Sequence, residues 1–122
     1  MAKYFSEEEM VCHCCGQLPQ GGINPILLDK LDELRERVGG PVHVNCMYRC
    51  PDHNAEVGGV PNSQHVLGNA ADIWVDNMGV DDLADLAADV GFDGIGRYYG
   101  SEFVHVDVRD DGNSPNCYQW NG

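Results

Sequence analysis

The chain has 122 residues, 43% of them hydrophobic, and its seven basic and 20 acidic residues give a formal net charge of −13. This length predicts one domain with a single core, and no run approaches the roughly 20 apolar residues of a membrane span. Because nucleic acids and anionic lipids recruit Lys and Arg, the acidic charge argues against both as partners and favours solubility. We therefore expect one domain over residues 1–122, a monomer that binds neither nucleic acid nor membrane.

The N-terminal residues 1–23 are expected to be irregular, with a short helical turn beginning at Ser6. They contain no apolar run of the length that a signal peptide needs. We therefore expect synthesis in the cytoplasm without a signal peptide, and action outside the cell only after release by another route.

The clearest predicted element is a helix over residues 24–38. Asn24 is a favourable N-cap, Pro25 suits the first helical position, and leucines recur at helical spacing on one face. The other predicted elements are a strand at 42–45, a short helix at 51–57, a strand at 70–75, a helix at 81–90, strands of a hairpin at 94–98 and 103–108, and a polar tail at 110–122. Together they predict an α+β domain with helices packed on one side of a small, mainly antiparallel sheet.

Six cysteines are many for a chain of this size, and three interpretations stay open: disulfides, a second metal site, or reduced thiols. A structural zinc site usually shows paired Cys-x-x-Cys spacings. The runs here, taken as Cys-x-Cys-Cys and Cys-x-x-x-Cys, fit that pattern poorly. Without a signal peptide, reduced thiols are favoured over disulfides. The cysteines, which do not decide the function, are Cys12, Cys14, Cys15, Cys46, Cys50 and Cys117.

Three side chains in the second half of the chain form a candidate ligand set: His65, Asp72 and His105. Two imidazoles and a carboxylate leave the fourth zinc position open for water, as catalytic zinc sites require. The small residues at 68–71 let the backbone pack close to such a site, and strand alternation places His105 and Asp107 on one face. A bound cation removes the cost of burying these charged groups together. The pattern therefore predicts a zinc hydrolase.

At these residues the chain resembles the zinc D-alanyl-D-alanine carboxypeptidases and peptidoglycan endopeptidases. Their fold is shared with the vancomycin-resistance D,D-dipeptidases and the hedgehog signalling domain. The Ser-x-His-x-x-Gly-x-Ala-x-Asp pattern of residues 63–72, followed by His-x-Asp at 105–107, is specific. The other matching segments are Tyr48-Arg49-Cys50-Pro51, His53-Asn54, Val57-Gly58-Gly59 and the glycine-rich run at 91–98.

The resemblance implies one zinc ion per chain, held by His65, Asp72 and His105. It implies that Arg49 polarises the scissile carbonyl or holds the substrate carboxylate, and a guanidinium suits either role. Ser63 would bind substrate or orient a ligand. The structural alternatives are a salt bridge for Arg49 and helix capping for Ser63.

Two carboxylates compete for the role of general base. In the dipeptidase branch a Glu three residues before the last ligand takes the proton of the zinc-bound water, and Glu102 matches that position. Asp107 is the competitor, and its alternative role is to hydrogen-bond a ligand imidazole. We favour Glu102. The chosen carboxylate would also protonate the leaving amine.

The resemblance implies a zinc metallopeptidase that hydrolyses an amide bond next to a D-amino acid. The substrate would be a peptidoglycan stem peptide or a D-Ala-D-Ala-type peptide, and the enzyme a carboxypeptidase or endopeptidase, such as a phage-type lysin. Cleavage of a terminal bond and of an internal cross-link both stay open. The competing hypotheses are a non-catalytic zinc-containing wall-binding module of the same fold and a disulfide-stapled domain with incidental histidines.

Overall fold

A five-stranded mixed sheet forms the centre of the computed structural model, which describes residues 4–12, 15–19, 21–56, 58, 63–113 and 117–122. The spatial order is β1-β2-β4-β3-β5, and every neighbouring pair is antiparallel except the parallel pair β3 and β5. The strands are β1 (His43–Cys46), β2 (Ala70–Trp74), β3 (Gly94–Tyr98), β4 (Phe103–Asp107) and β5 (Tyr118–Asn121). The predicted α+β class with a mainly antiparallel sheet is confirmed.

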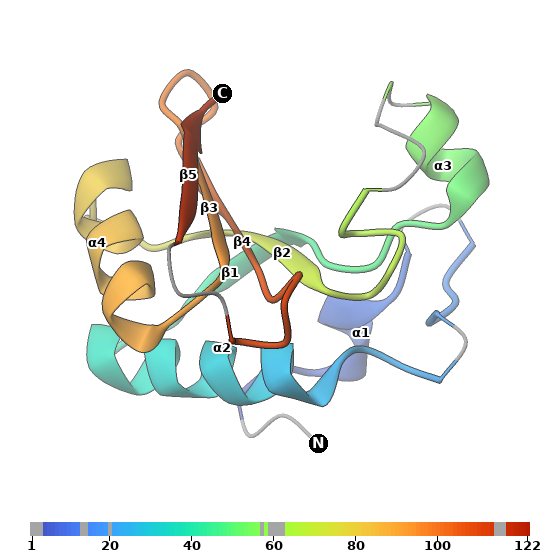
Figure 1. The fold of residues 1–122 in the computed structure, drawn as a ribbon, viewed down its shortest axis with the longest axis horizontal. Helices are drawn as coiled ribbons and strands as arrows, with labels where there is room; N and C mark the ends of the chain where they lie inside the picture. The colour runs from blue at the N-terminus through green and yellow to red at the C-terminus, as the bar shows by residue number, and fades with distance from the viewer. Residues whose placement is uncertain (1–3, 13–14, 20, 57, 59–62, 114–116) are drawn as a thin grey trace.

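Four helices accompany the sheet: α1 (Glu7–Met10), α2 (Pro25–Val38), α3 (Pro51–Glu56) and α4 (Val80–Val90). In Figure 1, α2 runs beneath the sheet and α4 lies at its left, while α1 and α3 lie at the right. The core lies between the sheet and the long helices, where the leucines of α2 pack with Ile73, Val104 and Val106. No helix in the described part of the chain combines the length and the apolar character that membrane crossing requires.

The helix α2 forms as its sequence predicts. The Asn24 side chain accepts a hydrogen bond from the N–H of Ile26 at 3.0 Å, which satisfies one of the unpaired donors of the first turn. Gly39 ends the helix in the left-handed conformation and donates its N–H to the carbonyl of Arg35. A shorter helical turn, α1, follows Ser6, whose N–H donates to the carboxylate of Glu9 at 3.0 Å.

The register of the sheet sets the geometry of the predicted site. Asp72 on β2 lies directly opposite His105 on β4, and Gly96 on β3 lies opposite His105 from the other side. A Cβ at Gly94 would overlap the Asp107 carboxylate, and a Cβ at Gly96 would lie 2.7 Å from the Trp120 indole. These two glycines therefore leave room for side chains that border the site.

The prediction of a polar tail over 110–122 is wrong at its end. Residues 118–121 form β5, which pairs with β3 so that Gly96 lies beside Trp120. The Tyr118 N–H donates to the carbonyl of Asp93 at 2.8 Å, which fixes the start of the strand. A four-residue edge strand with mostly exposed side chains carries little periodic signal, so composition alone favoured a tail.

Candidate metal centre

Three ligand atoms meet where β2, β4 and the loop before β2 come together. Asp72 Oδ1 lies 3.2 Å from His65 Nε2 and 3.1 Å from His105 Nδ1. All three side chains are buried, and their ligand atoms lie within 4.8 Å of one another. The structure therefore brings the predicted ligand set together around one point.

Each histidine uses its second ring nitrogen to hold its position. His65 Nδ1 lies 2.9 Å from the carbonyl oxygen of Met47, which can only accept, so this nitrogen carries the proton. His105 Nε2 lies 2.8 Å from Asp107 Oδ2 and donates to that carboxylate in the same way. In the metal-bound state these contacts would leave His65 Nε2 and His105 Nδ1 facing the common centre as ligand atoms, as in metal sites.

Asp107 lies behind His105 and is fully buried. Its carboxylate accepts hydrogen bonds from Arg109 Nε at 2.9 Å and Arg109 Nη2 at 2.7 Å. Burial alone would raise the pKa of Asp107, but the hydrogen bonds from His105 and Arg109 lower it to about 2. Asp107 is therefore ionised, and its oxygens are occupied by two neighbours.

His65 and Asp72 stabilise each other's charged forms. Burial alone would lower the pKa of His65, but hydrogen bonds to Asp72 and Cys46 raise it to about 10. Burial alone would raise the pKa of Asp72, but the hydrogen bonds from His105 and His65 outweigh burial and hold this pKa below its usual range. The set holds a carboxylate that attracts positive charge, from a proton or from a metal cation. Two imidazole nitrogens and a carboxylate oxygen fit zinc.

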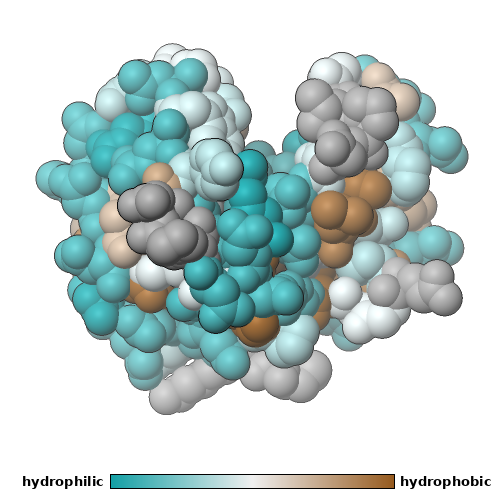
Figure 2. Space-filling model, in the orientation of Figure 1, coloured by the Kyte–Doolittle hydropathy of each residue, from teal (hydrophilic) through white to brown (hydrophobic). Residues whose placement is uncertain are grey.

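The ligand set borders a cavity of about 420 Å³. Figure 2 shows the surface hollowed between the β5 side and the α3 side of the molecule. Side chains from both sides line the cavity: Arg49, Ser63, Gln64, His65, Asp72, Tyr98, Phe103, His105, Arg109 and Trp120. The metal centre is thus open to a substrate on one side.

The predicted substrate-binding residues lie on the α3 side of this cavity. Arg49 donates from Nη1 to Asn54 Oδ1 at 2.9 Å, and its Nη2 lies 3.8 Å from Cys46 Sγ. Ser63 Oγ accepts a hydrogen bond from the N–H of His65 at 3.2 Å, so it orients the loop that carries this ligand. Both residues therefore lie where the sequence predicts, next to the ligand set.

Glu102 lies elsewhere. It occupies the turn between β3 and β4 with a positive φ of 56°, and it lines a different cavity together with Trp74, Asp76 and Ser101. The structure therefore groups Arg49, Ser63 and the ligands around one cavity, places Asp107 behind it, and leaves Glu102 outside. The motif residues Val57, Gly59 and Asn62 and the thiol of Cys14 lie outside the described residues.

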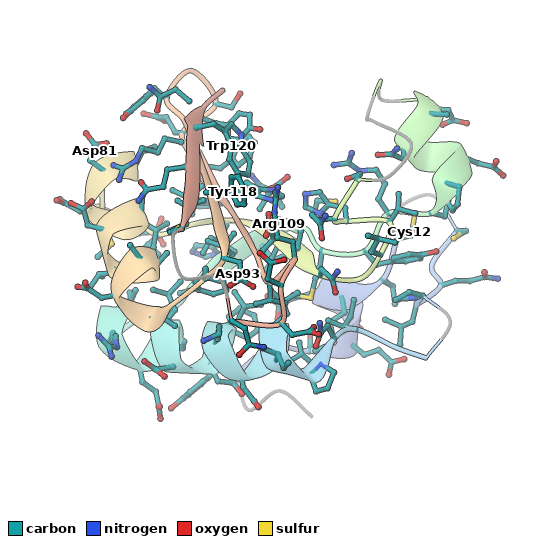
Figure 3. The ribbon with its side chains drawn as sticks, viewed as in Figure 1. Cys12, Asp81, Asp93, Arg109, Tyr118 and Trp120 are labelled. Carbon is teal, nitrogen blue, oxygen red and sulfur yellow. The ribbon has the colours of Figure 1, made fainter. Side chains whose placement is uncertain are left out.

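The sequence reasoning missed the wall on the β5 side. The Trp120 ring centroid lies 5.1 Å from that of His105, and Trp120 Nε1 donates to Tyr98 Oη at 3.1 Å. The Arg109 guanidinium lies over the rings of Tyr118 and Trp120 at 5.5 and 5.4 Å, and Figure 3 shows these three side chains grouped beside β5. The available signal was two aromatic residues at alternate positions, which is typical of a strand.

Comparison with known proteins identifies the family to which the chain belongs. The model of the family described as Peptidase M15 matches residues 3–107. The chain belongs to the peptidase M15 family. The resemblance to zinc D-Ala-D-Ala carboxypeptidases and peptidoglycan endopeptidases is thereby confirmed at the level of the family. The matched range contains the whole ligand set and ends before Arg109 and Trp120.

Two relatives of this M15 protein illustrate the range of the family. The chain is 36% identical over 94 residues to the zinc D-Ala-D-Ala carboxypeptidase of Streptomyces albus G, which covers 72% of this chain and 37% of that protein. It is 32% identical over 93 residues to the peptidoglycan L,D-endopeptidase MepK of Escherichia coli strain K12, which covers 70% of this chain and 51% of that protein. The chain thus spans about a third to a half of the curated relatives it matches.

Proposed function

We propose that this protein is a zinc-dependent peptidase that hydrolyses an amide bond next to a D-amino acid in peptidoglycan. The observation that carries the proposal is the meeting of His65 Nε2, Asp72 Oδ1 and His105 Nδ1 at one side of an open cavity. Membership of the M15 family and the names of the two relatives support the same reaction class.

The residues of the centre have separable tasks. His65, Asp72 and His105 would hold the zinc ion, which when bound acidifies water and polarises a carbonyl group. The carbonyl of Met47 and the carboxylate of Asp107 keep the two imidazoles in the tautomers that binding requires. Asp107 in this proposal is a positioning residue, because it contacts His105 from the buried side and does not line the cavity.

Arg49 is the proposed electrophilic residue. Its guanidinium lines the cavity, and contacts with Asn54 and Cys46 fix its direction. A planar guanidinium can bind the terminal carboxylate of a stem peptide or the oxyanion that forms from the scissile carbonyl. Arg109 also lines the cavity, but its guanidinium is paired with the Asp107 carboxylate, so Arg49 is the better placed of the two cations to bind an anionic peptide.

Glu102 remains the proposed proton acceptor. Because it lines a different cavity from the ligand set, this assignment needs its own test. If Glu102 is the base, Glu102→Gln lowers kcat by about 10²–10⁴-fold and leaves the zinc content unchanged. Unchanged kcat would remove Glu102 from the mechanism. Glu8→Gln, at an exposed position on α1, is the matched control.

The decisive experiment measures zinc and cleavage together. The purified protein without a histidine tag is incubated with peptidoglycan, and new free amines and released D-alanine are followed with and without a chelator. Zinc binding with chelator-sensitive cleavage supports the proposal, and the released fragment identifies the bond. Stoichiometric zinc without cleavage of any stem peptide would contradict it and favour the wall-binding alternative.

A further inference from the structure

A second group of metal-binding side chains lies on the other side of the molecule from β5. The sulfur atoms of Cys12, Cys15 and Cys50 lie within 4.8 Å of one another. Cys12 follows α1 and Cys50 immediately precedes α3, and Figure 3 places Cys12 at the right, between these helices. We call these three residues the cysteine cluster.

We propose that the cysteine cluster binds a second zinc ion, with a structural role. Counted from Cys12 to Cys15, the N-terminal run is a Cys-x-x-Cys pair, the spacing typical of structural zinc sites. The Cys-x-Cys-Cys description of the same residues does not show this pair, because it includes Cys14. Zn–S bonds of about 2.3 Å in a tetrahedron place the sulfurs about 3.8 Å apart, within the limit that the structure shows. A disulfide would use two of the three sulfurs and leave the third beside it.

Backbone hydrogen bonds form the turn that brings the first pair together. The Gly16 N–H donates to the Cys12 carbonyl at 2.7 Å, and the Cys12 N–H donates to the Gln17 carbonyl at 2.9 Å. Gly16 has a φ of 68°, which a residue with a Cβ rarely adopts. The turn therefore holds Cys12 and Cys15 on the same side, independently of any metal.

The third cysteine is directed at the same point from another segment. The N–H of Cys50 donates to Cys12 Sγ at 3.4 Å. Backbone N–H groups that donate to sulfur stabilise the thiolate form that zinc requires. Cys12 is fully buried while Cys15 is exposed, so the cluster lies at the protein surface with one open side. A water molecule or a further side chain can complete the tetrahedron there.

A zinc ion at this position would join two segments that are far apart in the sequence. Cys50 is adjacent to Arg49, which lines the catalytic cavity, and Tyr48 already pairs with Met10 through an N–H to carbonyl hydrogen bond of 3.1 Å. The cysteine cluster would therefore fix the N-terminal turn to the segment that carries Arg49. The protein would then bind two zinc ions per chain, instead of the one that the resemblance implies.

The test uses cobalt as a spectroscopic substitute for zinc. A thiolate-bound Co²⁺ ion gives a charge-transfer band in the near ultraviolet, whereas the catalytic set contains no sulfur. We expect two zinc ions per wild-type chain and the band after cobalt exchange. Cys15→Ser should retain one zinc and lose the band. Cys117→Ser, which changes a cysteine outside the cluster, should keep both.

A His105→Ala variant separates this inference from the proposed peptidase function. This variant should lose the metal at the catalytic site and keep the thiolate-to-cobalt band. The band therefore tests the cysteine cluster even if the proposed peptidase function is wrong. If Cys15→Ser does not fold, alkylation of the folded wild-type protein gives the answer instead. Cluster thiols that are protected until a chelator is added support the second zinc. The second zinc site would be overturned if every thiol reacted with the alkylating agent at one rate, with and without chelator. It would also be overturned if the denatured protein had two fewer free thiols than its six cysteines, because those two would form a disulfide.

Discussion

Asp107 is a fully buried carboxylate that contacts the proposed metal ligand His105 without lining the cavity. It receives hydrogen bonds from His105 on one side and from Arg109 on the other, and these keep it ionised in a place that excludes water. This contact with an ionised acceptor holds Nε2 of His105 and prevents the ring from turning.

The role of Asp107 can be tested by Asp107→Asn. We expect zinc affinity at the catalytic site to fall about 10–100-fold, because the neutral amide is a weaker acceptor for His105 Nε2. Competition with a chromophoric chelator measures the affinity. Asp89→Asn, at an exposed position on α4, is the matched control. Wild-type affinity in Asp107→Asn would contradict the positioning role.

The pKa of His65 predicts how metal binding depends on pH. In the metal-free protein, His65 keeps its second ring proton up to about pH 10, because the hydrogen bond to Asp72 outweighs burial and stabilises the imidazolium. Zinc must displace that proton, so its apparent affinity should rise about tenfold per pH unit between roughly pH 7 and 9. Zinc titrations in several buffers give the slope, and a pH-independent affinity would show that His65 is already neutral.

The same shift has the opposite effect on the stability of the metal-free fold. A raised pKa means that the imidazolium contributes stability fully below its ordinary pKa of about 6.5, and this contribution disappears as the pH rises through about 10. Denaturant unfolding of the metal-free protein should therefore show its free energy of unfolding falling across this window. The zinc-loaded protein should not share that fall.

At the scale of elements, the proposed metal ligands and the outer part of the cavity lining, which includes Trp120, lie on different segments. The ligands lie on the central strands β2 and β4 and on the loop before β2, where neighbours on both sides hold them. The opposite side of the cavity includes Trp120 of the edge strand β5, which pairs with β3 at the end of the strand order in the described part of the chain. Changes in β5 are therefore expected to alter substrate binding more than metal binding.

Gly96→Ala tests this separation. The new Cβ would lie 2.7 Å from the Trp120 indole, so the ring must move away from His105. We expect a higher KM for peptidoglycan fragments with an unchanged zinc content. Steady-state kinetics and metal analysis on the same sample measure both. Gly100→Ala, at a turn where the structure shows open space, is the control. A loss of zinc in Gly96→Ala would contradict the separation.

The elements also show what the sequence could predict. The helix α2 was predictable because its cap, its proline and its leucine spacing agree. The grouping of His65, Asp72 and His105 was predictable because their motif is specific, and their role as metal ligands stays a proposal. The strand β5 was not, because it is short, exposed and paired with a strand more than 20 residues earlier in the chain. The position of Glu102 was not predictable either. It depends on the positive φ of Glu102 itself, and glutamate is not a residue type that indicates this conformation.

At the scale of the whole molecule, metals are expected to contribute a large share of stability. A 122-residue domain has a modest core, and an ion that binds only the folded state at 1,000 times its Kd adds about 4 kcal/mol. Removing zinc with a chelator should lower Tm by several degrees, and stoichiometric zinc should restore it. Calorimetry of the metal-free and reloaded protein measures the difference; an unchanged Tm would contradict it.

The position of Trp120 has a consequence for how this protein can diverge. The Trp120 ring, which is tilted against the imidazole of His105, lies beyond residues 3–107, the range that the family model matches. Under the proposed function, substitutions around Trp120 would change which peptide binds, while the grouping of His65, Asp72 and His105 in the centre of the sheet stays the same. Exchanging the residues around Trp120 between relatives is therefore expected to change the preferred peptide and to leave metal binding intact.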